Sequence, residues 1–142
     1  MKKYILLSIL LVVLDQVTKF YFQGKDIAVN SFFSFTYLEN TGVAFGMFQG
    51  YNFIWIFVYI AALFIVWKYF RTYKLAWAII TAGIVGNLID RLVFGYVRDF
   101  IAFDFWAVFN LADSYNTIAV ILLFYALWKE EKVYKSRSHR QR

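Results

Sequence analysis

The 142-residue chain has no cysteine and no proline, and it has a single histidine. The lack of cysteine excludes a disulfide framework, a thiolate metal site and a cysteine nucleophile. The one histidine, His139, lies in a charged tail, where it is poorly placed for a metal site or a serine–histidine pair. We therefore expect neither a bound metal nor a cofactor.

Charge is also scarce, at 17% of residues, whereas hydrophobic residues make up 62% and aromatic residues 23%. Soluble domains usually contain about 45–50% apolar residues and roughly 25% charged residues. A chain this short has a high ratio of surface to volume and cannot bury such an excess of apolar side chains. We therefore expect much of the apolar surface to face lipid.

Four continuous apolar stretches are long enough to cross a bilayer, which takes about 20 residues at ~1.5 Å of helical rise each. A barrel would need many short alternating strands instead. The sequence thus predicts four transmembrane helices in a single integral membrane domain over residues 1–142. The predicted spans are residues 4–22, 51–67, 75–94 and 107–128, with an outer loop at 23–50 and a basic tail at 129–142.

Basic residues indicate the orientation of these spans. Eleven of the fifteen lysines and arginines lie on the side of the predicted bundle that holds both termini. By the positive-inside rule, both termini are cytoplasmic. The net charge of +6 is therefore an orientation signal that also attracts acidic lipids, and we do not expect a nucleic-acid partner.

Acidic residues show the opposite distribution, because seven of the nine lie in the outer half of the predicted bundle or beyond it. At ~1.5 Å per residue, Asp15, Asp90 and Asp113 lie about 17–23 Å above the cytoplasmic ends of three different spans. Charges at such a depth are costly unless they pair in a polar interior. We expect these carboxylates to share a pocket, while the second span, which has none, packs against the others or faces lipid.

Several of the polar residues have a structural explanation. Asp15 and Lys19 have i,i+4 spacing, which favours an ion pair within one helix. Asn87 and Asp90 share a helix face beside Arg91, with glycines about one turn below, so they are suited to cross-link closely packed helices. Arg91 is suited to hold either a phosphate or a backbone carbonyl near the interface.

Asp99 and Asp113 are the candidates for chemistry. Asp99 lies in a short outer connection, and Asp113 belongs to an i, i+3, i+7 stripe with Asn110 and Thr117. If the two carboxyls meet, they share one proton, so that one takes a proton from water while the other hydrogen-bonds a scissile carbonyl. The spacing alone also fits ion coordination or plain solvation. Arg98, next to Asp99, is expected to lower the pKa of that acid.

The outer loop carries a strand-like pattern over residues 31–37, where serine or threonine alternates with aromatic residues. A turn is predicted at residues 39–42, and the apolar stretch 43–48 is suited to lie in the membrane interface. We expect a small sheet on the outer surface followed by an interfacial segment. Such a lid can grip an extended peptide, although an aromatic belt without a ligand explains the pattern equally well.

Five motifs from the first predicted span to the fourth resemble, in order, those of the lipoprotein signal peptidase family. This family, also called signal peptidase II, consists of bacterial inner-membrane aspartyl proteases. The motifs are Asp15-Gln16-Val17-Thr18-Lys19, Asn40-Thr41-Gly42-Val43-Ala44-Phe45, Gly86-Asn87-Leu88-Ile89-Asp90-Arg91, Val97-Arg98-Asp99-Phe100 and Phe109-Asn110-Leu111-Ala112-Asp113-Ser114.

The resemblance implies that Asp99 and Asp113 are the catalytic pair. It implies a supporting and substrate-contacting shell formed by Asp15, Lys19, Asn40, Asn87, Asp90, Arg91 and Asn110. The implied fold is an all-α membrane protein: a four-transmembrane-helix bundle with a small extracytoplasmic β-cradle and an interfacial helical segment between the first two helices. The implied substrate is a prolipoprotein whose lipobox cysteine carries diacylglycerol, cleaved just before that cysteine. We expect a monomer in the bacterial inner membrane, with the active site toward the extracytoplasmic face.

Two other functions fit parts of the sequence. A small proton or ion translocator would use Asp15, Lys19, Asp90 and Asp113 as a relay, and it predicts acids along a path to both faces. Here the acids stop in the outer half, which favours the peptidase. A packing subunit without chemistry is the third hypothesis, and it predicts that both candidate catalytic acids are dispensable.

Overall fold

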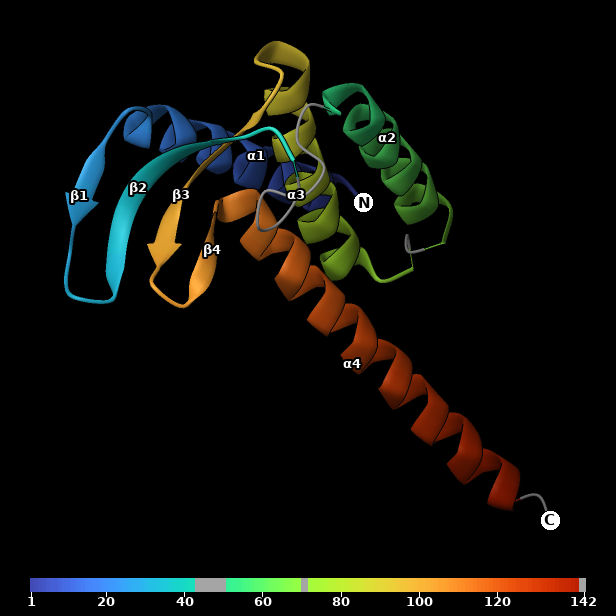
Figure 1. The fold of residues 1–142 in the computed structure, drawn as a ribbon. Helices are drawn as coiled ribbons and strands as arrows, with labels where there is room; N and C mark the ends of the chain where they lie inside the picture. The colour runs from blue at the N-terminus through green and yellow to red at the C-terminus, as the bar shows by residue number, and fades with distance from the viewer. Residues whose placement is uncertain (43–50, 70–71, 141–142) are drawn as a thin grey trace.

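The computed structural model describes residues 1–42, 51–69 and 72–140. These residues form four helices and one sheet (Figure 1). In chain order the elements are α1 (Lys2–Phe22), β1 (Asp26–Ala28), β2 (Phe33–Asn40), α2 (Asn52–Tyr69), α3 (Lys74–Val93), β3 (Val97–Phe103), β4 (Trp106–Phe109) and α4 (Leu111–Arg140).

All four helices are long and apolar enough to cross a membrane, as the sequence predicts. α3 contacts α1, α2 and α4, so it lies at the centre of the bundle (Figure 1). Half of the apolar window of α3 is buried inside the protein, whereas only 6% of the window of α2 is buried. The apolar surface of α2 is therefore suited to face lipid, one of the two roles predicted for this span. The fourth helix continues past its apolar part into the basic tail.

Two glycines allow α3 to approach α1 and α4 closely. A Cβ atom at Gly83 would lie only 2.6 Å from the carbonyl oxygen of Ala112 on α4. A Cβ atom at Gly86 would lie 2.6 Å from a carboxylate oxygen of Asp15 on α1. Helix backbones approach this closely only where side chains are small, so the predicted role of the glycines in close packing is confirmed.

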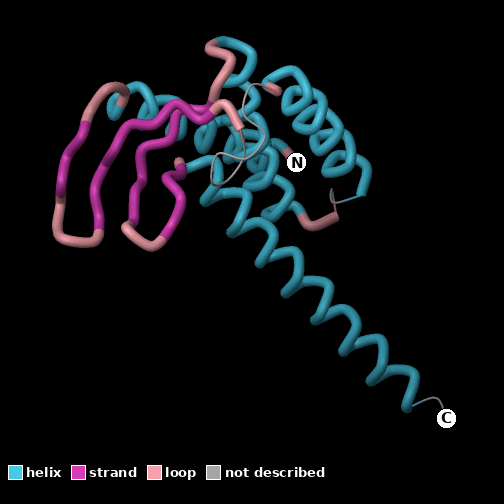
Figure 2. Tube along the Cα trace, viewed as in Figure 1, coloured by secondary structure: helices cyan, strands magenta, loops and turns pink. Residues whose placement is uncertain are grey.

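The sheet is antiparallel, with the strands in the order β1-β2-β3-β4 (Figure 2). Its first two strands come from the predicted outer loop, which confirms a sheet there. The other two follow α3, where the sequence analysis expected a short connection and the start of a helix. Residues 107–109 belong to β4 and α4 begins at Leu111, so the predicted fourth span starts four residues too early.

The end of the outer loop also differs from the prediction. Glu39 and Asn40 are the last residues of β2, and they pair with Arg98 and Val97 on β3. The predicted turn therefore begins only at Thr41. The interfacial segment expected at residues 43–48 lies outside the described residues.

Aromatic rings join the sheet to the bundle. Phe22, the last residue of α1, stacks on Phe35 of β2 with a centroid distance of 4.3 Å. It also stacks on Phe100 of β3 at 4.8 Å, and Phe100 is almost fully buried. Because Asp99 precedes Phe100 directly, these ring contacts fix the position of that part of β3 over the end of the bundle.

Candidate active site

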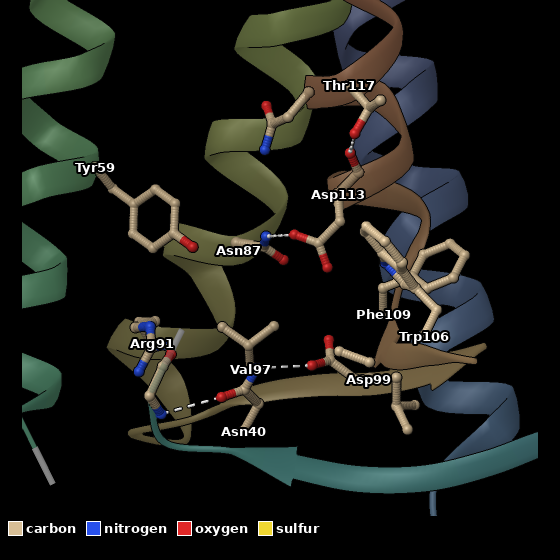
Figure 3. Close-up of a pocket in the computed structure, with 14 residues that line it drawn as sticks. Asn40, Tyr59, Asn87, Arg91, Val97, Asp99, Trp106, Phe109, Asp113 and Thr117 are labelled. Carbon is tan, nitrogen blue, oxygen red and sulfur yellow. Dashed lines mark hydrogen bonds between the residues drawn. The ribbon is translucent and has the colours of Figure 1, made fainter. Parts of the chain in front are cut away.

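Asp99 and Asp113 line the same cavity, although they come from different elements. Asp99 lies on β3 and Asp113 in the first turn of α4, and the cavity between them has a volume of about 310 Å³. Figure 3 shows both carboxyl groups pointing into this space. Asn40, Asn87 and Arg91 also line it. The structure thus brings together the two acids that the sequence singles out.

Asn110 holds the two acids in place. Its side-chain amide donates a hydrogen bond of 2.6 Å to Oδ1 of Asp99, and its backbone N–H donates one of 3.2 Å to Oδ2 of Asp113. Its Oδ1 in turn accepts a 3.0 Å bond from the backbone N–H of Asp113, which is the usual contact of an asparagine at a helix N-terminus. One fully buried residue therefore sets the relative position of both carboxyls.

Two further asparagine amides orient the carboxyls. Asn40 Nδ2 donates a 2.9 Å bond to Oδ2 of Asp99, and Asn87 Nδ2 donates a 2.8 Å bond to Oδ1 of Asp113. Each carboxyl is therefore contacted by two polar groups of the protein. Neutral amides orient a carboxyl without adding a full positive charge beside it, so its pKa is free to rise.

The pKa of Asp99 is raised to about 7. Burial of the side chain, which is only 1% exposed, is the main cause, and the charge of nearby Asp113 adds to the rise. The hydrogen bonds from Asn40 and Asn110 act in the opposite direction but do not cancel it. A pKa near neutrality allows Asp99 to bind or release a proton near neutral pH, which two carboxyls that share a proton would require.

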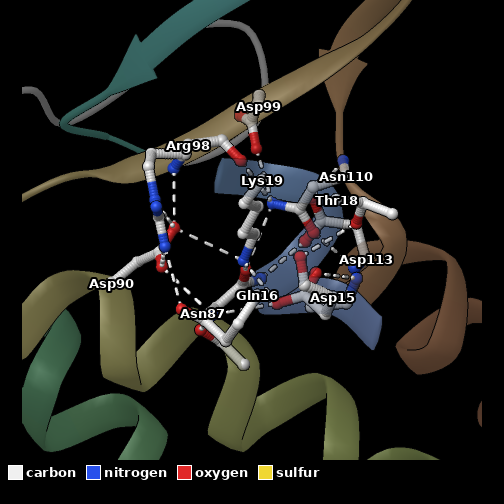
Figure 4. A network of polar contacts seen from close by, with 12 residues as sticks. Asp15, Gln16, Thr18, Lys19, Asn87, Asp90, Arg98, Asp99, Asn110 and Asp113 are labelled. Atoms are coloured by element: carbon white, nitrogen blue, oxygen red, sulfur yellow. Dashed lines mark hydrogen bonds and ion pairs between the residues drawn. The ribbon is translucent and has the colours of Figure 1, made fainter. Parts of the chain in front are cut away.

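Lys19 forms the centre of a second polar cluster next to the two acids (Figure 4). Its Nζ lies 2.9 Å from Oδ2 of Asp15 and 3.4 Å from Oδ2 of Asp90, and all three side chains are fully buried. The predicted pair within α1 is confirmed, and the structure extends it to α3. Nζ also donates a 2.9 Å bond to Oδ1 of Asn87. Because Lys19 takes the oxygen of that amide, the NH₂ group of Asn87 is turned toward Asp113.

Arg98 belongs to this second cluster. Its Nη2 lies 2.8 Å from Oδ1 of Asp90, and its backbone N–H donates a 2.9 Å bond to the other oxygen of the same carboxyl. Successive side chains on a strand point to opposite faces, so Arg98 and Asp99 point apart. Arg98 was expected to lower the pKa of Asp99, but that pKa is raised overall, and Arg98 is not among its main causes.

Arg91 holds the backbone beyond β2. Its guanidinium donates to the carbonyl oxygens of Thr41, at 3.2 Å, and of Gly42. The carbonyl contact proposed from the sequence is confirmed, and it ties the end of the sheet to α3. Asn52, at the start of α2, donates to the backbone oxygen of Arg91 at 3.1 Å, so one arginine joins three elements.

The sequence analysis missed Gln16, Asn52 and Tyr59. Gln16 donates hydrogen bonds of 3.0 Å to the carbonyl oxygen of Gly86 and 3.2 Å to Asp90. Tyr59 lines the cavity from α2, with its hydroxyl on the side of Asn87 (Figure 3). The sequence did contain a signal for two of them. Gln16 is a polar residue next to Asp15, and Tyr59 carries a hydroxyl group within an otherwise apolar span.

Thr117 completes the predicted stripe on α4 only in part. It lines the cavity, but its hydroxyl donates a 3.0 Å bond to the backbone oxygen of Asp113, and the residue is exposed. Asn110 and Asp113 face inward as predicted. The stripe is therefore fully buried at Asn110, half-buried at Asp113, and exposed at the edge of the cavity at Thr117.

Three acids of the described helices lie at one end of the bundle, two of them fully buried and the third half-buried. Asp15, Asp90 and Asp113 are joined through Lys19 and Asn87, as the similar depths predict. This arrangement can bind a polar group at the pair of Asp99 and Asp113, which we call the dyad, and can transfer one proton there. It does not resemble a relay of acids toward both ends of the helices.

Comparisons with known proteins identify a family and similar structures. A family profile described as signal peptidase (SPase) II matches residues 7–129. The lipoprotein signal peptidase of Streptococcus pyogenes serotype M1 is 43% identical, and the match covers 92% of this chain and 97% of that protein. A bacterial membrane enzyme solved by the in meso method at 2.3 Å superposes with a TM-score of 0.84 at 31% identity, covering 92% of this chain and 90% of that one. A second such enzyme, at 1.9 Å, gives 0.77 at 32% identity over 89% and 93% of the two chains.

Proposed function

Because the chain belongs to the signal peptidase II family, a family of bacterial multi-pass membrane proteases, we propose that it is an aspartyl endopeptidase acting on lipidated prolipoproteins. In this proposal it removes the signal peptide by cutting just before the diacylglyceryl-modified cysteine. The observation that carries the proposal is the meeting of Asp99 and Asp113 in one cavity, joined through Asn110. The Streptococcus pyogenes relative named above is a lipoprotein signal peptidase, which supports the choice of substrate.

The proposed reaction uses one proton shared by two carboxyls. The ionised carboxyl accepts a proton from a water molecule, and the oxygen of that water attacks the scissile carbonyl carbon. The protonated carboxyl donates a hydrogen bond to the carbonyl oxygen while negative charge develops there. The carbon–nitrogen bond then breaks, and the nitrogen leaves as an amine after taking up a proton from the dyad.

The other predicted site residues support this pair. Asn40, Asn87 and Asn110 orient the carboxyls through the hydrogen bonds described above. Lys19 fixes the orientation of Asn87, and Asp15 and Asp90 compensate the buried charge of Lys19. These residues act through Asp99 and Asp113 and are positioning residues.

The proposal also places the protein in the inner membrane as one integral domain of residues 1–142, acting as a monomer. The bias of lysine and arginine favours cytoplasmic termini, and the dyad then faces the extracytoplasmic side. The sheet would lie at that surface, where its position beside the cavity suits a cradle for an extended peptide. Arg91 would hold Thr41 and Gly42 beside the site.

A cleavage assay with purified protein tests this function. We expect the protein in detergent to cleave a precursor carrying S-diacylglyceryl cysteine, with a kcat/KM at least about tenfold higher than for the unlipidated precursor. Binding of a part of the substrate that does not itself react contributes to catalysis, so removal of the lipid lowers the rate. A precursor with serine in place of that cysteine is the control for non-specific proteolysis. Equal rates on lipidated and unlipidated precursors would contradict the proposed substrate.

A further inference from the structure

A second cavity of about 440 Å³ opens beside the candidate active site, between the β3–β4 hairpin and the start of α4. We call it the hairpin groove. It is lined by Phe103, Phe105 and Trp106 from the hairpin and by Ser114, Thr117 and Ile118 from α4. Most of its wall is aromatic or aliphatic, so burial of hydrocarbon there is favourable.

The hydroxyl groups in the groove wall are already engaged. Ser114 Oγ donates a 3.1 Å bond to the backbone oxygen of Asn110. Thr117 Oγ1 donates a 3.0 Å bond to the backbone oxygen of Asp113. Both hydroxyl groups therefore already donate their hydrogen bonds to backbone oxygens, one in α4 and one in Asn110, the residue that precedes it. This leaves the groove suited to an apolar occupant instead of a sugar, a phosphate or a peptide backbone.

The groove is continuous with the candidate active site. Trp106, Phe109, Asp113 and Thr117 line both cavities. An occupant of the groove therefore lies next to the carboxyl of Asp113. A group attached to the substrate close to the reacting atoms could therefore reach the groove.

The rim of the groove is open toward the surroundings of the bundle. Phe105 is 76% exposed and Trp106 is 60% exposed, although both are large apolar side chains. They belong to the tip of the hairpin and to the start of β4, beside a helix apolar enough to span a membrane. Aromatic residues in such a position favour contact with lipid chains at the membrane boundary.

We propose that the hairpin groove binds one acyl chain of the diacylglyceryl group of the substrate. This inference rests on the proposed function, in which the lipidated cysteine directly follows the scissile bond. The chain would then start within a few bonds of the dyad and run along Phe103 and Ile118 toward lipid. A volume of about 440 Å³ is in the range that holds a whole small ligand, which is more space than one apolar side chain of the signal peptide fills.

Filling the groove should change the preference for acyl length. The length preference is the kcat/KM for a dihexadecanoylglyceryl precursor divided by the kcat/KM for a dibutanoylglyceryl precursor. We expect Ile118→Trp to lower this preference by about tenfold, mainly through a higher KM for the long-chain precursor. The larger side chain excludes the distal part of a long chain and leaves room for a short one. The measurement is steady-state cleavage of the two synthetic precursors, which have the same peptide sequence.

Val120→Trp is the matched control, because Val120 is an exposed residue of the same helix that does not line the groove. It should leave the length preference unchanged. Phe105→Ala removes an exposed wall residue without threatening the fold, and it should also reduce the preference for the long chain. A length preference unaltered in both groove variants, or lowered equally by Val120→Trp, would overturn the acyl-chain site. If the wild-type protein cleaves neither precursor, the proposed function itself fails.

Discussion

Asp99→Asn and Asp113→Asn should each reduce cleavage of a lipidated precursor by at least about 10²–10⁴-fold, the usual contribution of general acid–base catalysis. An amide can neither accept the proton of the attacking water nor share a proton with the remaining carboxyl. The measurement is single-turnover cleavage with each purified variant in excess over the precursor. Single-turnover conditions separate the chemical step from product release.

Both variants should remain folded, because asparagine has nearly the size of aspartate. In Asp113→Asn the new carbonyl oxygen can still accept the bond from Asn87. Asp26→Asn, on the exposed strand β1, is the matched control and should keep full activity. If Asp99→Asn or Asp113→Asn retained near-normal turnover, the dyad would be wrong. If both variants fully replaced the wild-type protein in cells, the hypothesis of a packing subunit would be favoured.

Lys19→Met should destabilise the protein by about 3–5 kcal/mol, the usual cost of removing one partner of a buried ion pair. The substitution leaves the buried carboxyl of Asp15 without its cation and deprives Asp90 of one of its two cations. It also frees the oxygen of Asn87, so the amide that contacts Asp113 loses its fixed orientation. We expect a lower free energy of unfolding in detergent micelles, and a lower kcat in whatever fraction remains folded.

Lys135→Met is the matched control, because Lys135 forms an exposed i,i+4 pair with Glu131. Exposed pairs of this kind contribute only about 0.3–0.5 kcal/mol. The double variant Lys19→Met/Asp15→Asn should recover part of the lost stability, since it removes the unpaired charge. Equal losses for Lys19→Met and Lys135→Met would show that the buried cluster has no special role.

Much of the helical bundle could be predicted from the sequence because hydropathy and helical rise act locally. Apolar runs locate all four helices, and similar depths predict that Asp15, Asp90 and Asp113 meet. The start of α4 could not be found in this way. Residues 107–109 are as apolar as the helix that follows, and a short apolar run is compatible with either a strand or a helix.

The site was less predictable where it depends on strand pairing. Arg98 and Asp99 are neighbours in sequence, and their separation into two clusters follows only once β3 is known to be a strand. The position of Asn40 beside Asp99 depends on the pairing of β2 with β3, two segments about sixty residues apart. No local pattern encodes that register. The family resemblance supplied Asn40 where physical reasoning from the sequence alone did not.

The central claim, that Asp99 and Asp113 share one proton during cleavage, is tested most directly by the pH dependence of kcat/KM on a lipidated precursor. Because the pKa of Asp99 is raised to about 7, Asp99 keeps its proton below that pH and loses it above. We predict a rate that falls as the pH rises through about 7, in step with loss of the shared proton. A rate that stays constant or increases from about pH 6 to about pH 9 would contradict the shared proton and, with it, the proposed mechanism.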